Sequence, residues 1–263
     1  MASITFLGTG GGRFVVLNQR RYSGGLFLDL ESKISLDPGP GALIRALQFK
    51  KDPQKLDGIL VSHHHIDHYN DAEILVEAMT HGMRTKRGVL VLNKGTLDYV
   101  SSYHKSFVEL IVAEPEKKFS IGELEIECLP TMNHEDAVGF RFNSKHGTII
   151  CSSDTAYSKD LAGNYKGAKV LILNTIVPAS KEIETHLNTR GAASIIKEAK
   201  PEVAITQHFG MTMLNCDPAK EAKMIEDETG VRTIAARDGM ELDLDSLVES
   251  MPAKVSQSRL GSY

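Results

Sequence analysis

Short runs of apolar and β-branched residues recur along the chain and predict a series of short strands. Other segments carry apolar residues at helical spacing with start or stop signals, such as Asp217-Pro218 before the last helix and Gly230 after it. Strands are expected at 4–7, 25–30, 33–36, 58–61, 89–92, 124–129, 138–142, 148–151, 169–173 and 203–206, and helices at 41–50, 71–81, 189–200 and 217–230. Because strands cluster in each half of the chain with helices between them, we expect an α/β fold, a four-layer αββα sandwich.

One polar segment, directly after the expected strand 58–61, is dense in metal-ligating side chains. Residues 63–68 have the sequence His-His-His-Ile-Asp-His, which contains the pattern HxHxDH. Imidazole nitrogen and carboxylate oxygen suit zinc and neighbouring divalent metals, and a short loop can direct alternate side chains to one ion and the others to a second. A histidine-rich surface loop is the alternative. Four suitable side chains within six positions favour a centre for two metal ions.

Single residues of the same kind follow three later strands. His134 comes after 124–129, Asp154 after 148–151 and His208 after 203–206. Loops at strand ends often gather functional groups on a rigid scaffold. Taken alone, Asp154 also suits a plain turn and His208 a hydrogen-bonded core histidine. Their order along the chain makes all three candidates for the same centre.

Composition and charge narrow the class of protein. With 263 residues, 41% of them hydrophobic, we expect one domain over 1–250 and a flexible polar tail at 251–263. The net charge of −4 provides no overall basic surface for nucleic acid, and three widely spaced cysteines argue against a disulfide framework. The start of the chain lacks the basic region of a signal peptide, and no apolar run approaches the roughly 18 residues of a membrane span. We therefore expect a cytoplasmic protein with no membrane partner.

The motif HxHxDH, two later strand-end histidines and the aspartate of Ser153-Asp154-Thr155 together resemble the metallo-β-lactamase-fold hydrolases over nearly the whole chain. The resemblance implies a ligand set for two divalent metal ions, zinc first, with manganese or iron as alternatives. One ion would be held by His63, His65 and His134, the second by Asp67, His68 and His208, and Asp154 would bridge them.

A further histidine, His186, narrows the resemblance to one branch of the family. It precedes the helix that leads to the His208 strand, and the segment 186–209 is similar to ribonuclease Z and to the cyclic-phosphate phosphodiesterase of phosphonate degradation. The chain departs from ribonuclease Z in having only a short hairpin between His134 and Asp154, where that enzyme inserts a long tRNA-binding arm. It departs from the phosphonate-pathway enzyme in having no cysteine over 8–22.

These features predict a dinuclear metal-dependent hydrolase, a phosphodiesterase that attacks a phosphate ester with a metal-bridging hydroxide. Asp67 would orient the water and His186 would assist the leaving oxygen. The substrate would be a small-molecule or nucleotide phosphodiester, such as RNA or a cyclic nucleotide, and a homodimer stays open. Hydrolysis of a thioester or β-lactam carbonyl is the alternative activity. A scaffold protein that keeps metal only for stability is the alternative from another class.

Overall fold

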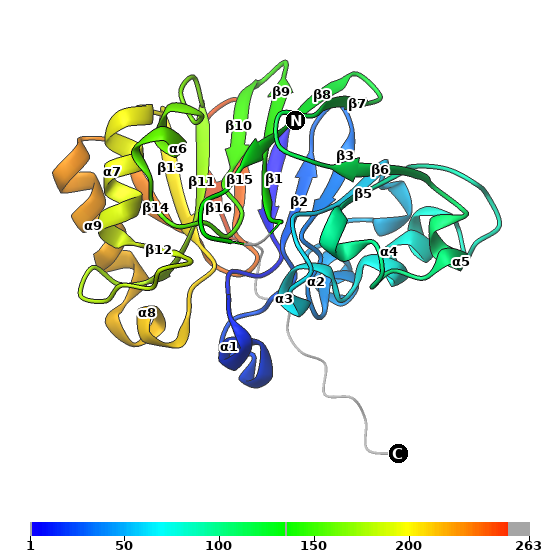
Figure 1. The fold of residues 1–263 in the computed structure, drawn as a ribbon, viewed down its shortest axis with the longest axis horizontal. Helices are drawn as coiled ribbons and strands as arrows, with labels where there is room; N and C mark the ends of the chain where they lie inside the picture. Colours follow the sequence, from blue (N-terminus) through cyan, green and yellow to red (C-terminus); the bar gives the residue numbers. More distant parts are fainter. Residues whose placement is uncertain (1, 135, 252–263) are drawn as a thin grey trace.

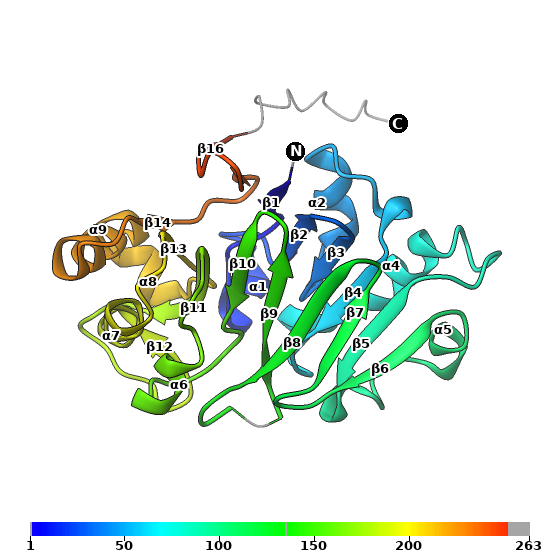
Figure 2. The same cartoon turned by 90° about the horizontal axis from the view of Figure 1, so that it is seen from above.

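The computed structural model describes residues 2–134 and 136–251, and these residues form two large β-sheets that pack face to face (Figures 1 and 2). In spatial order the first sheet contains β16 (Glu249–Ser250), β15 (Glu241–Asp243), β1 (Ser3–Phe6), β2 (Leu26–Asp29), β3 (Lys33–Leu36), β4 (Gly58–Val61), β5 (Val89–Asn93) and β6 (Glu109–Ala113). The second contains β14 (Thr233–Ala235), β13 (Val203–Gln207), β11 (Val170–Val177), β10 (Gly147–Cys151), β9 (Val138–Ser144), β8 (Leu124–Pro130) and β7 (Lys118–Ile121), with β12 (Leu187–Asn188) paired to β11.

Helices cover the outer face of each sheet. The α-helices are α1 (Arg13–Asn18), α2 (Ala42–Gln48), α3 (Ile66–Tyr69), α4 (Ala72–Met79), α5 (Ser102–Lys105), α6 (Lys159–Gly163), α7 (Thr189–Ala199), α8 (Met211–Cys216) and α9 (Pro218–Thr229), and short 3-10 turns lie at η1 (Pro53–Lys55) and η2 (Lys94–Thr96). Apolar residues of α2 and α4 pack on the first sheet, and those of α6, α7 and α9 pack on the second. The αββα sandwich is therefore confirmed.

The central parallel strands, such as β4, β5 and β11, are apolar on both faces because both faces are buried. In β4, for example, Leu60 points into the core between the sheets, whereas Ile59 and Val61 pack under the outer helices. This alternation follows from the two-residue period of a strand. The central core takes Phe6 and Leu28 from the first sheet and Phe142 from the second, all fully buried.

Every strand and helix expected from the sequence is present within a few residues, and the three cysteines are free, as expected. Residues 8–12 lead into α1, a short helix that the sequence pattern did not predict. The pattern also missed β6, an edge strand with exposed positions, and the short helices α5, α6 and α8. None of the helices among the described residues is long and apolar enough to cross a membrane. The expected tail at 251–263 falls, apart from Met251, outside the described residues, and the domain bounds stay a prediction.

The parallel strands bring their carboxyl ends to one edge of the sandwich. β3, β4 and β5 are mutually parallel in the first sheet, and β10, β11 and β13 are mutually parallel in the second. The ends of β3, β4, β8, β10 and β13 are followed by Asp37, His63, His134, Asp154 and His208, respectively. The fold thus gathers residues that are far apart in the sequence.

We expect Phe142→Ala to lower the free energy of unfolding by about 3–5 kcal/mol, because removing a fully buried ring between the sheets leaves a cavity. Urea denaturation followed by circular dichroism measures the change. Phe14→Ala is the matched control, since Phe14 is 75% exposed on α1, and it should change stability by less than about 0.5 kcal/mol. Equal losses in the two variants would contradict this packing.

Candidate metal centre

The HxHxDH segment turns sharply from strand into helix, and this turn separates its side chains. β4 ends at Val61, His65 is the extended N-cap residue of α3, and Asp67 and His68 lie in the first turn of that helix. His64 belongs to neither cluster described below; its ring stacks on Tyr99 with centroids 5.6 Å apart. The alternation that the motif predicted is therefore present.

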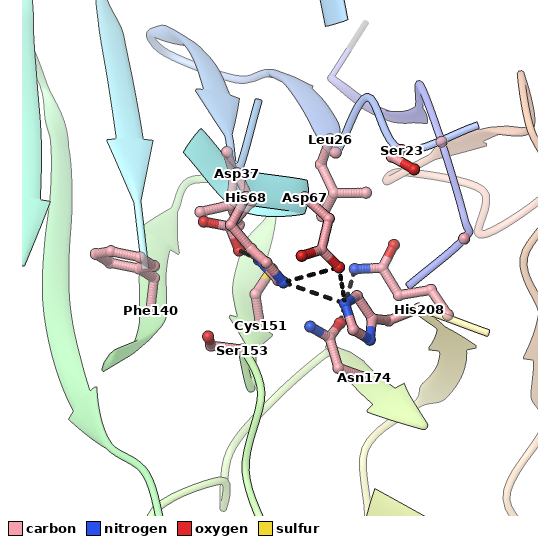
Figure 3. A pocket seen from close by; sticks show the side chains of 15 residues that line it. Ser23, Leu26, Asp37, Asp67, His68, Phe140, Cys151, Ser153, Asn174 and His208 are labelled. Carbon is pink, nitrogen blue, oxygen red and sulfur yellow. Dashed lines mark hydrogen bonds and ion pairs between the residues drawn. The ribbon is translucent and has the colours of Figure 1, made fainter. Parts of the chain in front are cut away.

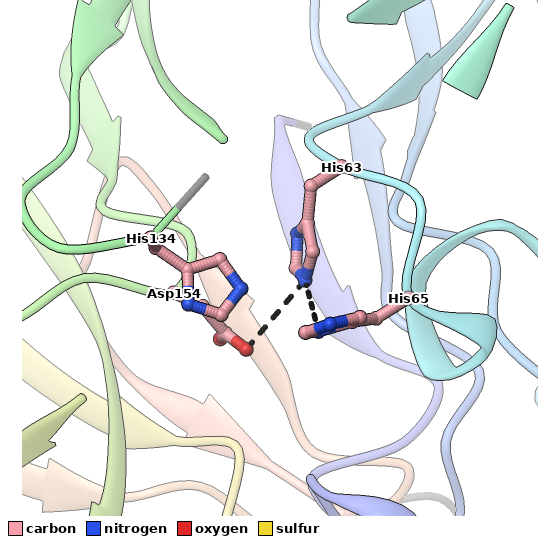
Figure 4. A group of neighbouring side chains, drawn as sticks. All are labelled: His63, His65, His134 and Asp154. Atoms are coloured by element: carbon pink, nitrogen blue, oxygen red, sulfur yellow. Dashed lines mark hydrogen bonds and ion pairs between the residues drawn. The ribbon is translucent and has the colours of Figure 1, made fainter. Parts of the chain in front are cut away.

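The first cluster consists of His63, His65, His134 and Asp154, whose ligating atoms all lie within 4.8 Å of one another (Figure 4). His63 Nε2 is 3.0 Å from His65 Nδ1 and 3.8 Å from Asp154 Oδ2. The residues come from the β4–α3 loop, the loop after β8 and the loop after β10. Both sheets therefore contribute to this cluster.

The second cluster consists of Asp67, His68 and His208, and all three are buried (Figure 3). His208 Nε2 lies 3.1 Å from His68 Nε2 and 3.3 Å from Asp67 Oδ2. His208 follows β13, so this cluster also joins the two sheets.

The carboxylate of Asp154 lies between the two clusters. Its Oδ2 is 3.8 Å from His63 Nε2 and 3.4 Å from His68 Nε2, and its Oδ1 is 3.5 Å from His208 Nδ1. The amide of Asn174 donates a hydrogen bond to Oδ1 at 2.8 Å and fixes the carboxylate orientation. This is the position that a bridging ligand requires.

The donor chemistry fits divalent cations. Two imidazole nitrogens 3.0–3.1 Å apart can have at most one proton between them, and both close nitrogen pairs are packed beside carboxylates. His208 Nδ1 is buried with no hydrogen-bond partner. Converging lone pairs from nitrogen and carboxylate oxygen are what zinc and similar ions bind.

Burial and charge set the protonation of these groups. Burial lowers the pKa of His134 to about 4. Although burial opposes charge on Asp154, the neighbouring His208 and His68 hold the pKa of its carboxyl well below the usual range. Burial likewise opposes charge on His68, but the carboxylates of Asp154, Asp37 and Asp67 raise its pKa well above the ordinary value. The carboxylates thus favour a positive charge beside them, which a divalent ion would supply.

Asp37, at the end of β3, supports a histidine of each cluster. A carboxylate can only accept, so His68 Nδ1 donates to Asp37 Oδ2, 2.9 Å away. Ser62 Oγ donates to the same oxygen at 2.9 Å and therefore accepts from His63 Nδ1 at 3.0 Å. Both histidines are left with Nε2 facing the centre, the arrangement expected of carboxylate-oriented metal ligands.

The glycine segment 8–12 forms a wall of the second cluster. The Gly12 N–H donates to Asp67 Oδ2 at 2.8 Å, and a Cβ at Gly11 would overlap the ring of His208. Asp238 holds this segment in place by accepting from the backbone N–H groups of Thr9 and Tyr22, both at 2.9 Å. Only glycine allows the backbone to approach the histidine this closely.

His186 lies at the rim of the centre. Its Nε2 is 3.2 Å from Asp154 Oδ2, and its Nδ1 is 2.7 Å from Thr185 Oγ1. The side chain keeps 16% of its surface exposed, in contrast to the 2% of Asp154. His186 therefore contacts the central carboxylate and can also be reached from outside.

All eight residues singled out from the sequence meet at this site. Sequence reasoning missed Ser62 and Asn174 as supporting groups. Asn174 did leave a signal, since it is the one amide side chain in the fully buried run Val170–Val177. A polar residue in such a strand needs a buried partner.

Comparison with known proteins shows the superfamily to which the chain belongs. A family model described as the beta-lactamase superfamily domain matches residues 32–209, and the chain belongs to this superfamily. The protein MJ1374 of Methanocaldococcus jannaschii is 36% identical over 253 residues, which cover 92% of this chain and 94% of that protein.

Two further matches bear on the branch of the superfamily and on the three-dimensional fold. Ribonuclease Z of Methanopyrus kandleri is 23% identical over 276 residues, covering 89% of this chain and 95% of the relative. The crystal structure of the metallo-beta-lactamase fold protein YhfI from Bacillus subtilis superimposes with a TM-score of 0.78 at 18% identity, covering 95% of this chain and 99% of that chain. The resemblance inferred from the motifs is confirmed.

We expect Asp37→Asn to reduce divalent-ion affinity about 10- to 100-fold, because the supporting carboxylate of two histidines is lost. Asparagine retains the size and tolerates the left-handed backbone of this position, where φ is 51°. Competition with a chromogenic chelator measures the affinity. Asp245→Asn, which alters a surface partner of His146, is the control and should leave the affinity unchanged. Equal affinities in the two variants would refute the role of Asp37.

Proposed function

We propose that the chain is a dinuclear metal-dependent phosphodiesterase. The observation that carries this proposal is the contact of His186 Nε2 with Asp154 Oδ2 at 3.2 Å, because it positions a proton-carrying group at the rim of two clusters suited to divalent ions. The similarity to ribonuclease Z supports a phosphate ester as substrate.

In this proposal His63, His65 and His134 would hold one ion and Asp67, His68 and His208 the other, and Asp154 would contribute to both. Such a pair lowers the pKa of bound water and neutralises phosphate oxygens when it is present. We propose zinc as the metal, with manganese and iron as alternatives, since all accept nitrogen and carboxylate ligands.

Three side chains of the protein have further roles in the proposed reaction. Asp67 orients the attacking water, and the Gly12 N–H holds its Oδ2 at 2.8 Å so that the carboxylate does not rotate. Asn174 fixes Asp154 in the same way. His186, steadied at Nδ1 by Thr185, carries the proton at Nε2 that the departing alkoxide requires.

Carbonyl hydrolysis is the competing activity, because the same centre also suits attack on a thioester or β-lactam. We propose a cytoplasmic enzyme, with homodimer formation an open alternative.

The activity is tested by initial rates of metal-loaded protein on bis(p-nitrophenyl) phosphate, on a chromogenic β-lactam and on a glutathione thioester. We expect turnover of the phosphodiester, and we expect Asp154→Ala to lose both this activity and bound metal, because the shared ligand is removed. Bound metal is measured by mass spectrometry, independently of the activity. Turnover of the carbonyl substrates alone would contradict the proposal. Metal binding without turnover of any substrate would also contradict it and would favour a protein that keeps metal only for stability.

The role of His186 predicts a dependence on the leaving group. With an alkyl leaving group, as in a dinucleotide, we expect His186→Ala to lower kcat by roughly 10²–10⁴-fold, the usual contribution of general acid catalysis. With p-nitrophenolate, which departs without a proton, the loss should be much smaller. Metal content should be unchanged, and His146→Ala, a surface variant, should behave like wild type. Equal losses for both leaving groups would show that His186 only supports the site.

A further inference from the structure

A groove opens beside His186, between the segment after β10 and the start of α7. Its volume is about 390 Å³, within the range of pockets that bind small molecules. His186 forms part of its wall, so the groove is continuous with the rim of the metal centre. Its other walls include Tyr157, Ile183, Glu182, Glu184 and Arg190.

The walls of this groove combine one aromatic and one aliphatic side chain that are only partly covered. Tyr157 is 46% exposed and Ile183 is 42% exposed. A half-covered tyrosine ring offers a face on which a planar ring can stack. The apolar surface therefore suits a flat, uncharged group.

The charged residues of the groove exclude a strongly anionic occupant. The groove is lined by two carboxylates, those of Glu182 and Glu184, and by one guanidinium, that of Arg190. Carboxylates accept hydrogen bonds from amino and hydroxyl groups but repel a second phosphate. A polyanion would instead need a basic track along its backbone.

The rim of the groove is held by hydrogen bonds before any substrate arrives. Asn133 Nδ2 donates to the Glu184 carbonyl at 3.2 Å, and Asn188 Nδ2 donates to the Lys181 carbonyl at 2.8 Å. The Asn188 side chain also caps α7 by accepting from the Gly191 N–H at 2.8 Å. A preformed groove loses less conformational freedom when it binds.

From these contacts we propose that the groove binds the nucleoside of a phosphodiester substrate, with the base stacked on Tyr157 and the phosphate at the metal centre. The inference rests on the proposed function and specifies its substrate: a small nucleotide ester with one nucleoside next to the reacting phosphate. His186 stands where the two parts of such a substrate join.

The test compares two phosphate monoesters that differ only in the nucleoside, namely AMP and methyl phosphate. Dissociation constants for the metal-loaded protein are measured by ligand-observed NMR, which needs no turnover. We expect AMP to bind at least about tenfold more tightly than methyl phosphate, because stacking on an aromatic side chain contributes at this scale. Tyr157→Ala should weaken AMP by about tenfold and leave methyl phosphate unchanged.

Tyr103→Ala is the matched control, since Tyr103 is 57% exposed on α5 and does not line the groove. It should alter neither constant. Equal binding of AMP and methyl phosphate, or an equal loss of both in Tyr157→Ala, would overturn the inference. If bis(p-nitrophenyl) phosphate is not hydrolysed while AMP keeps its Tyr157-dependent preference, the proposed function fails and the nucleoside groove stands.

Discussion

Two buried carboxylates and one half-buried carboxylate, in contact with buried histidines, are the interaction on which the site depends. Asp37 Oδ2 lies 2.9 Å from His68 Nδ1, and Asp67 Oδ2 and Asp154 Oδ2 lie 3.8 and 3.4 Å from His68 Nε2. Asp37 and Asp154 lie in the loops after β3 and β10, whereas Asp67 lies in α3. The same contacts that orient the histidines therefore also tie the loops of the two sheets together. Because buried charges must be compensated, these loops are stable in this arrangement only as a set.

The backbone at this edge is strained where functional residues lie. Asp37, Ser153 and His208 have φ angles of 51°, 58° and 61°, and Asn133, just before His134, has 54°. Left-handed conformations at residues other than glycine are uncommon and cost about 1–3 kcal/mol each. Ser153 and Asn133 lie just before Asp154 and His134, whereas Asp37 and His208 adopt this conformation themselves. The strain is thus concentrated where the loops must aim their side chains.

The groove and the metal centre obey different physical requirements. The centre is buried and fixed by hydrogen bonds, as at Asp154, which is 1% exposed and accepts from Asn174. The groove beside it is open and lined by a tyrosine face and exposed charges. The buried centre keeps the reacting groups in a fixed geometry, whereas the open groove leaves room for a substrate to enter. His186 contacts the centre and also lines the groove.

The sequence by itself determined the strands, the main helices and the residues that meet at the site. Strands such as β4 and β11 are buried on both faces, so their apolar runs stand out. The ligating residues stand out because they follow those runs directly. The pattern did not predict β6 or α1, since edge strands and short exposed helices need no apolar face. Only the tertiary structure decided that Asp154 lies between both clusters, that Asn174 and Ser62 fix the ligands, and that Tyr157 and Arg190 share a groove with His186. These relations join residues from separate strands and loops, and their distances depend on how two sheets pack, which local sequence does not encode.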